Sequence, residues 1–277
     1  MPMPFLQNHG ANIYWDERGA GDPVLMIMGL SYPSYMWHRT RPVVSTAFRT
    51  IAFDNRGVGQ SDVPPGPYPI PLMAADAAAV LDAAGVESAH VVAFSMGGMI
   101  AQEFALHYPN RVRSLVLGAT MTGGREAVQP ELAVIQILMA KDLTPTQATD
   151  AIIPVIYDKH TPRKRIDEDM EIRLKWYPTP QGYLAQLQGI MMWGGTWSRI
   201  SRIAAPTLLI HGETDRLIPP VNANMLAERI PGATLVTLPH ASHIFTTDQT
   251  EPALHALMQF LRAQAAVGAQ SRGTLQT

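Results

Sequence analysis

The chain has 277 residues, of which 47% are hydrophobic, so it is long enough to bury the core of one large domain. Its formal net charge is only −2, and no strongly basic face stands out, so neither nucleic acid nor a membrane surface is expected as a partner. The absence of cysteine excludes disulfides, thiolate metal sites and a cysteine nucleophile, and it is compatible with the cytoplasmic location that we expect.

At the start of the chain, residues 1–9 lack a basic segment followed by an apolar run, so no secretory signal is predicted. No stretch approaches about 18 uncharged apolar residues, and no membrane span is predicted. Residues 11–15 form the first strand-like run, and the glycines of residues 19–22 suggest a turn. Together these two segments predict an antiparallel hairpin at one edge of a sheet.

Short, continuous apolar runs follow, and each ends at a turn or a polar residue. Such runs are typical of strands buried on both faces, as in a parallel sheet. They comprise residues 24–28, 50–53, 90–94, 114–117, 207–210 and 234–238. Helical patterns occur at residues 73–84, 96–107, 222–230 and 250–266. The alternation predicts an α/β fold with a mostly parallel, doubly wound sheet and right-handed crossovers.

The alternation stops between residues 123 and 195, where helical stretches, prolines and methionines replace the buried-strand runs. This composition predicts a helical cap inserted between two strands, above the carboxyl ends of the sheet, where open α/β sheets bind ligands. The predicted domains are a core formed by residues 1–122 and 196–266, the cap at 123–195, and a disordered polar tail at 267–277.

A candidate nucleophile, Ser95, directly follows the strand-like run 90–94 and precedes a helical pattern. A tight strand-to-helix turn exposes a serine hydroxyl and requires small residues two positions before and after it, here Ala93 and Gly97. The alternative interpretation is a serine whose side chain only caps the following helix.

A serine hydroxyl needs a base that accepts its proton and a carboxylate that orients the base. His243 follows the last strand-like run by a short loop, and we favour it over His240 at the strand end. Asp215 follows the preceding run, and we favour it over Glu213, which is closer to the strand end. Asp248 is interpreted as an N-cap of the last helix.

An oxyanion hole requires two backbone N–H groups that point at one position. Met96, the residue after the candidate nucleophile, would supply one of them. Leu30, in the loop after the first buried run, would supply the other, because Gly29 lets that loop approach the substrate closely.

Five segments in this order resemble those of the α/β-hydrolase superfamily. They are residues 28–30, 54–61, 93–98, 211–215 and 240–243, and the resemblance extends over about residues 10–265. The similarity is to the capped branch that contains esterases, lactonases, cofactor-free perhydrolases and C–C bond hydrolases. It implies a Ser95–Asp215–His243 triad without metal or cofactor. Met28 departs from the histidine usual before Gly29, and this removes a common polar anchor of that loop.

The expected substrate is a small, fairly apolar carboxylic ester, hydrolysed through an acyl-enzyme, and a lactone is the alternative. Perhydrolysis and C–C cleavage use the same triad and stay open, as does the choice between a monomer and a homodimer. Apolar side chains of the cap and of the oxyanion loop suggest the pocket wall. The residues expected there are Gly29, Tyr32, Met36, Trp37, Met139, Met191, Met192, Trp193 and Ile244.

Two readings of other classes compete with this one. His240 and His243 with Asp215 or Asp248 could bind a metal, but their spacing is common by chance and no further ligand set accompanies it. A receptor-like protein that kept the fold would bind a ligand without turnover. The complete triad argues against such a binder, since binding alone does not require all three groups.

Overall fold

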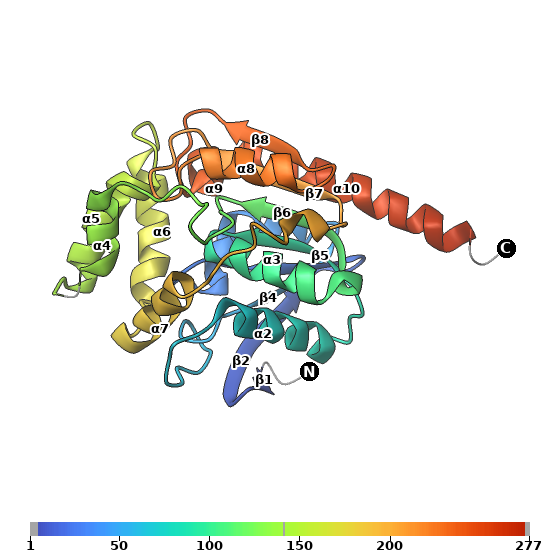
Figure 1. Ribbon diagram of the computed structural model, residues 1–277, viewed down its shortest axis with the longest axis horizontal. Coiled ribbons are helices and arrows are strands. Elements are labelled where there is room, and N and C mark those ends of the chain that lie inside the picture. Colours follow the sequence, from blue (N-terminus) through green and yellow to red (C-terminus); the bar gives the residue numbers. More distant parts are fainter. Residues whose placement is uncertain (1–4, 141, 275–277) are drawn as a thin grey trace.

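The computed structural model describes residues 5–140 and 142–274. An eight-stranded sheet lies at its centre, in the order β1-β2-β4-β3-β5-β6-β7-β8 (Figure 1). The strands are β1 (Phe5–Asn8), β2 (Ala11–Arg18), β3 (Pro23–Ile27), β4 (Arg49–Phe53), β5 (Ala89–Phe94), β6 (Val112–Gly118), β7 (Thr207–Gly212) and β8 (Thr234–Leu238). Strand β2 pairs antiparallel with both of its neighbours, β1 and β4. All other neighbouring strands, from β4 through β3, β5, β6 and β7 to β8, pair in parallel. The predicted mostly parallel α/β sheet is therefore confirmed.

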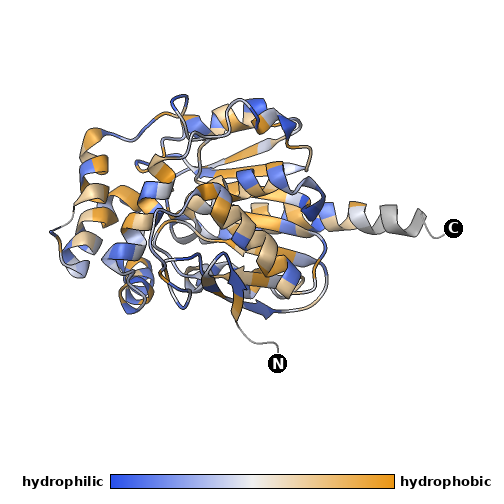
Figure 2. Cartoon of the chain, turned by 60° about the horizontal axis from the view of Figure 1, so that its bottom comes forward, coloured by the Kyte–Doolittle hydropathy of each residue, from blue (hydrophilic) through white to orange (hydrophobic). Residues whose placement is uncertain are grey.

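Helices cover both faces of the sheet, which explains why its central strands are apolar along their whole length. Leu25 and Ile27 of β3 pack toward one face, and Val24 and Met26 pack toward the other. Helices α2 (Ile70–Ala83), α3 (Met96–His107) and α8 (Val221–Arg229) contribute to the first layer, and helices α1 (Arg41–Val44) and α10 (Thr250–Thr274) contribute to the second. Figure 2 shows the hydrophobic strands enclosed between these helices.

The helices of the core domain are α1 (Arg41–Val44), α2 (Ile70–Ala83), α3 (Met96–His107), α8 (Val221–Arg229), α9 (Phe245–Asp248) and α10 (Thr250–Thr274). Helices α2, α3 and α8 agree with the predicted helical patterns to within a few residues, whereas the short helices α1 and α9 were not predicted. Short 3-10 helices are η1 (Ser34–Arg39), η2 (Pro109–Arg111) and η3 (Ile200–Arg202).

Between β6 and β7 the chain forms four helices, in the segment where the sequence predicts a cap. They are α4 (Leu132–Met139), α5 (Pro145–Ile156), α6 (Arg163–Lys175) and α7 (Pro180–Met191). They gather at one end of the sheet, opposite the end from which α10 projects (Figure 1). The return to the core is anchored where the Trp193 indole N–H donates to Glu103 Oε1 of α3 at 2.8 Å.

The structure has an antiparallel hairpin at the edge of the sheet, but the predicted position of its turn is wrong. The antiparallel partner of β2 is β1, and they are joined at His9 and Gly10. Residues 19–22 instead lead from β2 to β3, which are not neighbours because β4 lies between them. A Cβ on Gly19 would lie 2.4 Å from backbone oxygens of Ser45 and Phe48, so this glycine permits close packing rather than a hairpin.

The last helix is longer than the predicted pattern 250–266. Helix α10 continues to Thr274, so residues 267–274 are helical where we expected a disordered tail, and residues 275–277 lie outside the described part. No proline interrupts this segment, and its alanine and glutamine residues favour helix. Neither α10 nor another described helix combines the length and apolar character needed to cross a membrane.

A buried ion pair joins the loop after β4 to α2. Arg56 donates through Nε and Nη2 to the two carboxylate oxygens of Asp76, both at 2.7 Å, and the side chains are 3% and 0% exposed. Replacing Arg56 by Met leaves a buried carboxylate without its partner, so we expect the free energy of unfolding to fall by about 3–5 kcal/mol. Urea denaturation measures this change.

The exposed pair of Arg163 and Asp167 on α6 provides the control. We expect Arg163→Met to change the free energy of unfolding by less than about 1 kcal/mol. Equal effects of the two substitutions would contradict a structural role for the Arg56–Asp76 pair.

Candidate active site

Ser95 occupies a sharp turn between β5 and α3. Its backbone has φ 57° and ψ −122°, a strained conformation for a residue with a side chain, and its N–H donates to Gly118 O at 2.8 Å. The turn brings α3 against β3, so that a Cβ on Gly97 would lie 2.2 Å from Ile27 O. The Ser95 side chain makes no capping hydrogen bond to α3, so the alternative reading as a helix cap is wrong.

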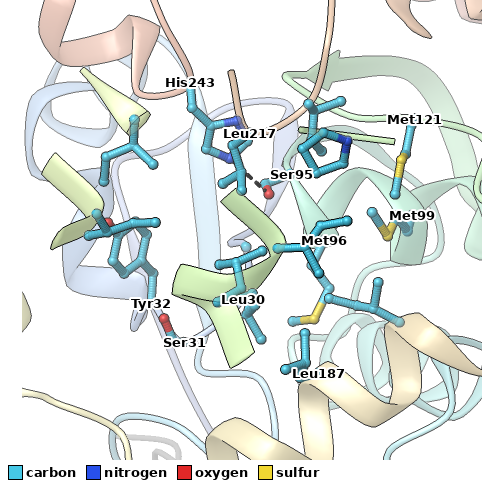
Figure 3. Close-up of a pocket in the computed structure, with 18 of the residues that line it drawn as sticks. Leu30, Ser31, Tyr32, Ser95, Met96, Met99, Met121, Leu187, Leu217 and His243 are labelled. Atoms are coloured by element: carbon cyan, nitrogen blue, oxygen red, sulfur yellow. Dashed lines mark hydrogen bonds between the residues drawn. The ribbon is translucent and has the colours of Figure 1, made fainter. Parts of the chain in front are cut away.

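The Ser95 hydroxyl lies at the start of a chain of hydrogen bonds. Ser95 Oγ is 3.0 Å from His243 Nε2 (Figure 3), and His243 Nδ1 is 2.9 Å from Asp215 Oδ2. All three side chains are buried. In the neutral imidazole, a proton on Nδ1 donates to Asp215, which leaves Nε2 free to accept the Ser95 proton.

The rejected alternatives lie elsewhere. His240 is exposed, and its ring packs against His160 with a centroid separation of 5.0 Å. The Glu213 side chain is exposed, and within the described part of the chain it forms no hydrogen bond or ion pair with His243; its backbone N–H donates to Leu238 O. The structure thus brings Ser95, His243 and Asp215 together and leaves His240 and Glu213 outside this group.

The Asp215 carboxylate is fixed by four groups. Oδ1 accepts hydrogen bonds from the backbone N–H groups of Leu217 and Ile218, at 2.9 and 2.8 Å. Oδ2 faces His243 and also lies 3.2 Å from His211 Nε2. Burial by itself would raise the pKa of Asp215, but His243 and His211 outweigh it and lower the pKa to about 2. The carboxylate is therefore ionised at neutral pH and can stabilise a charged His243.

Leu30 and Met96 line the same cavity as Ser95. Within the described part of the chain, neither backbone N–H donates a hydrogen bond to another residue. Met96 opens α3, where the first N–H groups lack intrahelical partners and the helix dipole favours negative charge. The assignment of these two groups to an oxyanion hole stays a prediction, which their lack of other partners permits.

Two side chains hold the loop that carries Leu30, although it lacks the histidine anchor at Met28. Asn55 Nδ2 donates to Met28 O at 2.9 Å, and the N–H of Ser31 donates to Gln186 Oε1 at 2.9 Å. Gln186 belongs to α7 and also donates through Nε2 to Arg56 O at 2.8 Å. A buried amide from the cap therefore anchors the oxyanion loop to the core.

A largely apolar cavity of about 320 Å³ extends from Ser95 beneath the cap (Figure 3). Four of the expected wall residues line it: Gly29, Tyr32, Met139 and Met191. Its wall also includes Leu30, Ser95, Met96 and His243, so the reacting groups open onto the cavity. The volume suits a small organic molecule.

Five expected wall residues lie elsewhere. Met36 and Trp37 of η1, and Ile244, are buried in the second packing layer of the core. Trp193 is buried against α3, where its N–H needs the glutamate acceptor described above. Met192 follows the last residue of α7 and is 70% exposed. In each case packing, and not proximity in sequence, decides which way the side chain points.

Several wall residues were not predicted. Met99 lies one turn after Met96 on α3, a spacing that could have indicated it. Met121 follows β6, while Tyr183 and Leu187 lie one turn apart on α7. Arg173 of α6 also lines the cavity, and no pattern in its highly charged helix indicated this position.

Asp248 is not the predicted cap of the last helix, because α10 begins at Thr250. Its Oδ2 accepts hydrogen bonds from Ser242 N at 2.6 Å and from Asp158 N at 3.3 Å, and Thr161 donates to Oδ1. The carboxyl group thus joins the loop of His243 to the segment before α6. Burial raises its pKa to about 6 despite these hydrogen bonds.

The predicted metal alternative is not supported by the positions of its histidines, since His243 contacts Ser95 and Asp215. Among the described residues, Asp158, His160 and His240 place ligand atoms within 4.8 Å of one another. Asp158 Oδ1 already accepts from His160 Nδ1 at 2.8 Å, and none of the three borders the Ser95 cavity. The chemistry assembled at Ser95 uses no metal ligand from this group.

Known proteins share this sequence and fold. Residues 22–148 match the alpha/beta hydrolase fold family. A poly(3-hydroxyalkanoate) depolymerase of Ectopseudomonas oleovorans is 33% identical over 220 residues, 77% of this chain and 75% of the relative. A 3-oxoadipate enol-lactonase of Acinetobacter baylyi is 29% identical over 226 residues, 80% and 82% of the two chains. The structure of Est816, an N-acyl homoserine lactone degrading enzyme, is similar with a TM-score of 0.80 at 29% identity. The alignment covers 93% of this chain and 100% of the Est816 chain.

The chain therefore belongs to the α/β-hydrolase fold family. The resemblance drawn from its five sequence segments is confirmed, and its relatives indicate a hydrolase. The order serine, aspartate, histidine along the chain agrees with this fold.

Gly29 packs so closely on the nucleophile that a methyl group has no room. A Cβ there would lie 2.9 Å from Ser95 Cβ and 3.4 Å from Ser95 Oγ. We expect Gly29→Ala to slow modification of Ser95 by a fluorophosphonate about 10–100-fold, because small displacements of reacting groups have effects of this size. Gly194→Ala, where nothing lies within 4 Å of the added Cβ, is the control and should react at the wild-type rate. Similar rates for all three proteins would rule out this steric role.

Asp248 should make stability depend on pH. Its folded-state pKa of about 6 lies above the ordinary value of 3.8, so its stabilising contribution is complete below pH 3.8 and is lost as pH rises through about 6. Asp248→Asn stays neutral and keeps an acceptor for Ser242. We expect the Tm of this variant minus that of the wild type to increase from pH 4 to pH 7, as measured by scanning calorimetry. A Tm difference independent of pH would contradict the expectation.

Proposed function

We propose that this hydrolase cleaves carboxylic esters or lactones of small, largely apolar molecules, with Ser95 as nucleophile. The observation that carries the proposal is the continuous hydrogen-bonded series from Ser95 Oγ through His243 to the ionised Asp215. Ser95 and His243 line a cavity together with Leu30 and Met96, whose backbone N–H groups have no partner among the described residues. This is the arrangement that acyl transfer requires.

In the proposed mechanism, Ser95 Oγ attacks the ester carbonyl carbon while His243 Nε2 accepts the hydroxyl proton. The carbonyl oxygen becomes negative and accepts hydrogen bonds from the N–H groups of Leu30 and Met96. Collapse of the intermediate breaks the C–O bond, and His243 donates its proton to the departing alcohol oxygen. Water then attacks the acyl-enzyme, again losing a proton to His243, and this releases the acid and restores Ser95.

The cavity and the relatives support the choice of substrate class. The cavity wall is mainly leucine, isoleucine and methionine, which suits an apolar acyl or alcohol group. The names of the relatives refer to a polyester in one case and to lactones in two. The apolar wall and these names support C–O cleavage at an ester or a lactone as the proposed reaction.

Ser95→Ala tests this proposal. We expect kcat for short-chain esters to fall by about 10³–10⁶-fold, because the nucleophile is lost while the oxyanion groups remain. A panel of methyl esters and lactones with acyl chains of graded length, followed by acid release, gives both the activity and its size preference. Ser201→Ala, at an exposed position, is the control and should retain wild-type rates. Equal turnover by wild type and Ser95→Ala would refute the assignment.

A further inference from the structure

Among the described residues that line the apolar cavity, one has a permanently charged side chain. Arg173 reaches its wall from α6 of the cap. The guanidinium carbon lies 4.9 Å from the ring centroid of Tyr32 and 5.8 Å from that of Tyr177. Because Tyr32 follows Leu30 by two residues, the cation faces the same loop that carries a proposed oxyanion donor.

No anion in the described part of the chain pairs with Arg173. Its Nε is buried and has no hydrogen-bond acceptor among the described residues, and the adjacent Tyr32 hydroxyl is also buried without a well-aligned partner. The two groups interact with each other, but the tyrosine hydroxyl is neutral and does not balance the guanidinium charge. Asp169, one turn earlier on α6, is the nearby buried carboxylate, but its oxygens are occupied. They accept hydrogen bonds from His38, Arg39, Tyr157 and Thr247.

A guanidinium without a paired anion is unfavourable at the wall of a largely apolar cavity. Removing a charged group from water carries a large cost, which proteins normally offset with an opposite charge. Two aromatic faces stabilise a cation only modestly. Two buried polar atoms, Arg173 Nε and the Tyr32 hydroxyl oxygen, thus have no anionic acceptor among the described residues. Arg173 and Tyr32 both line the cavity that also contains Ser95.

We propose that Arg173 and the Tyr32 hydroxyl form a subsite for a carboxylate, and that the substrate is an ester or lactone carrying a second, free carboxylate group. This inference rests on the proposed function, and it deepens that proposal by naming the substrate class. The planar guanidinium suits a carboxylate because it donates two parallel hydrogen bonds, and the tyrosine hydroxyl can donate a third. The apolar wall then accommodates the hydrocarbon chain between the carboxylate and the carbonyl that Ser95 attacks.

The first experiment compares monomethyl esters of dicarboxylic acids, from succinate to suberate, with methyl alkanoates of matched chain length. For the wild type we expect a kcat/KM ratio, charged over neutral, of at least about 10 at the best chain length, since charge-assisted hydrogen bonds contribute on this scale. Arg173→Met should lower the ratio about 10–100-fold, and Arg173→Lys should give an intermediate value. Arg163→Met, on the same helix but exposed, is the control and should keep the wild-type ratio. A wild-type preference for the neutral esters, or the same ratio in Arg173→Met, would overturn the subsite.

The second experiment separates the subsite from catalysis. Glutarate and adipate are titrated into the Ser95→Ala protein by calorimetry, and the titration is repeated with Ser95→Ala/Arg173→Met. We expect binding to the first protein and at least about 10-fold weaker binding to the second. If dicarboxylates bind through Arg173 but no ester is hydrolysed, the proposed function fails and the subsite stands. If esters are hydrolysed and dicarboxylates bind neither protein, the subsite fails and the hydrolase stands.

Discussion

Ser95 lies where a buried strand must turn at once into a buried helix, and the rest of the site is arranged around that turn. The left-handed backbone at φ 57° directs the hydroxyl away from both elements. It also forces α3 against β3, which is possible only because Gly97 has no side chain. The strain is local, and the packing of helices on both faces of the sheet sustains it.

Parallel strand pairing brings the other groups to the same edge. The loops after β3, β7 and β8 carry Leu30, Asp215 and His243, residues that are far apart in sequence. Each loop is then fixed by its own polar contacts: Gln186 binds the first, Leu217 and Ile218 hold Asp215, and Asp248 binds the third. The sheet therefore positions the loops, while buried hydrogen bonds adjust them to the geometry of proton transfer.

The sequence predicts the central strands and the candidate triad well because both have strong local signals. Continuous apolar runs identify β3 and β5, whereas β1 is short and half-exposed and has no such signal. The cavity wall is less accessible to this reasoning. Met191 lines the cavity and its neighbour Met192 does not, a difference that depends on how α7 packs. Arg173 belongs to a helix whose many charges resemble a solvated face, so only the tertiary structure reveals its position.

The side chain of Gln186 joins α7 to two loops of the core, the oxyanion loop and the loop after β4. The Ser31 N–H is held by an amide of the cap, and that same amide binds the core loop at Arg56. The Ser31 N–H and the Arg56 carbonyl belong to buried residues, so an outward displacement of α7 would leave both groups without these partners. The position of α7 and that of the oxyanion loop are therefore energetically linked. One buried amide makes the loop that carries Leu30 sensitive to the packing of a helix whose Gln186 lies 155 residues from Ser31 in sequence.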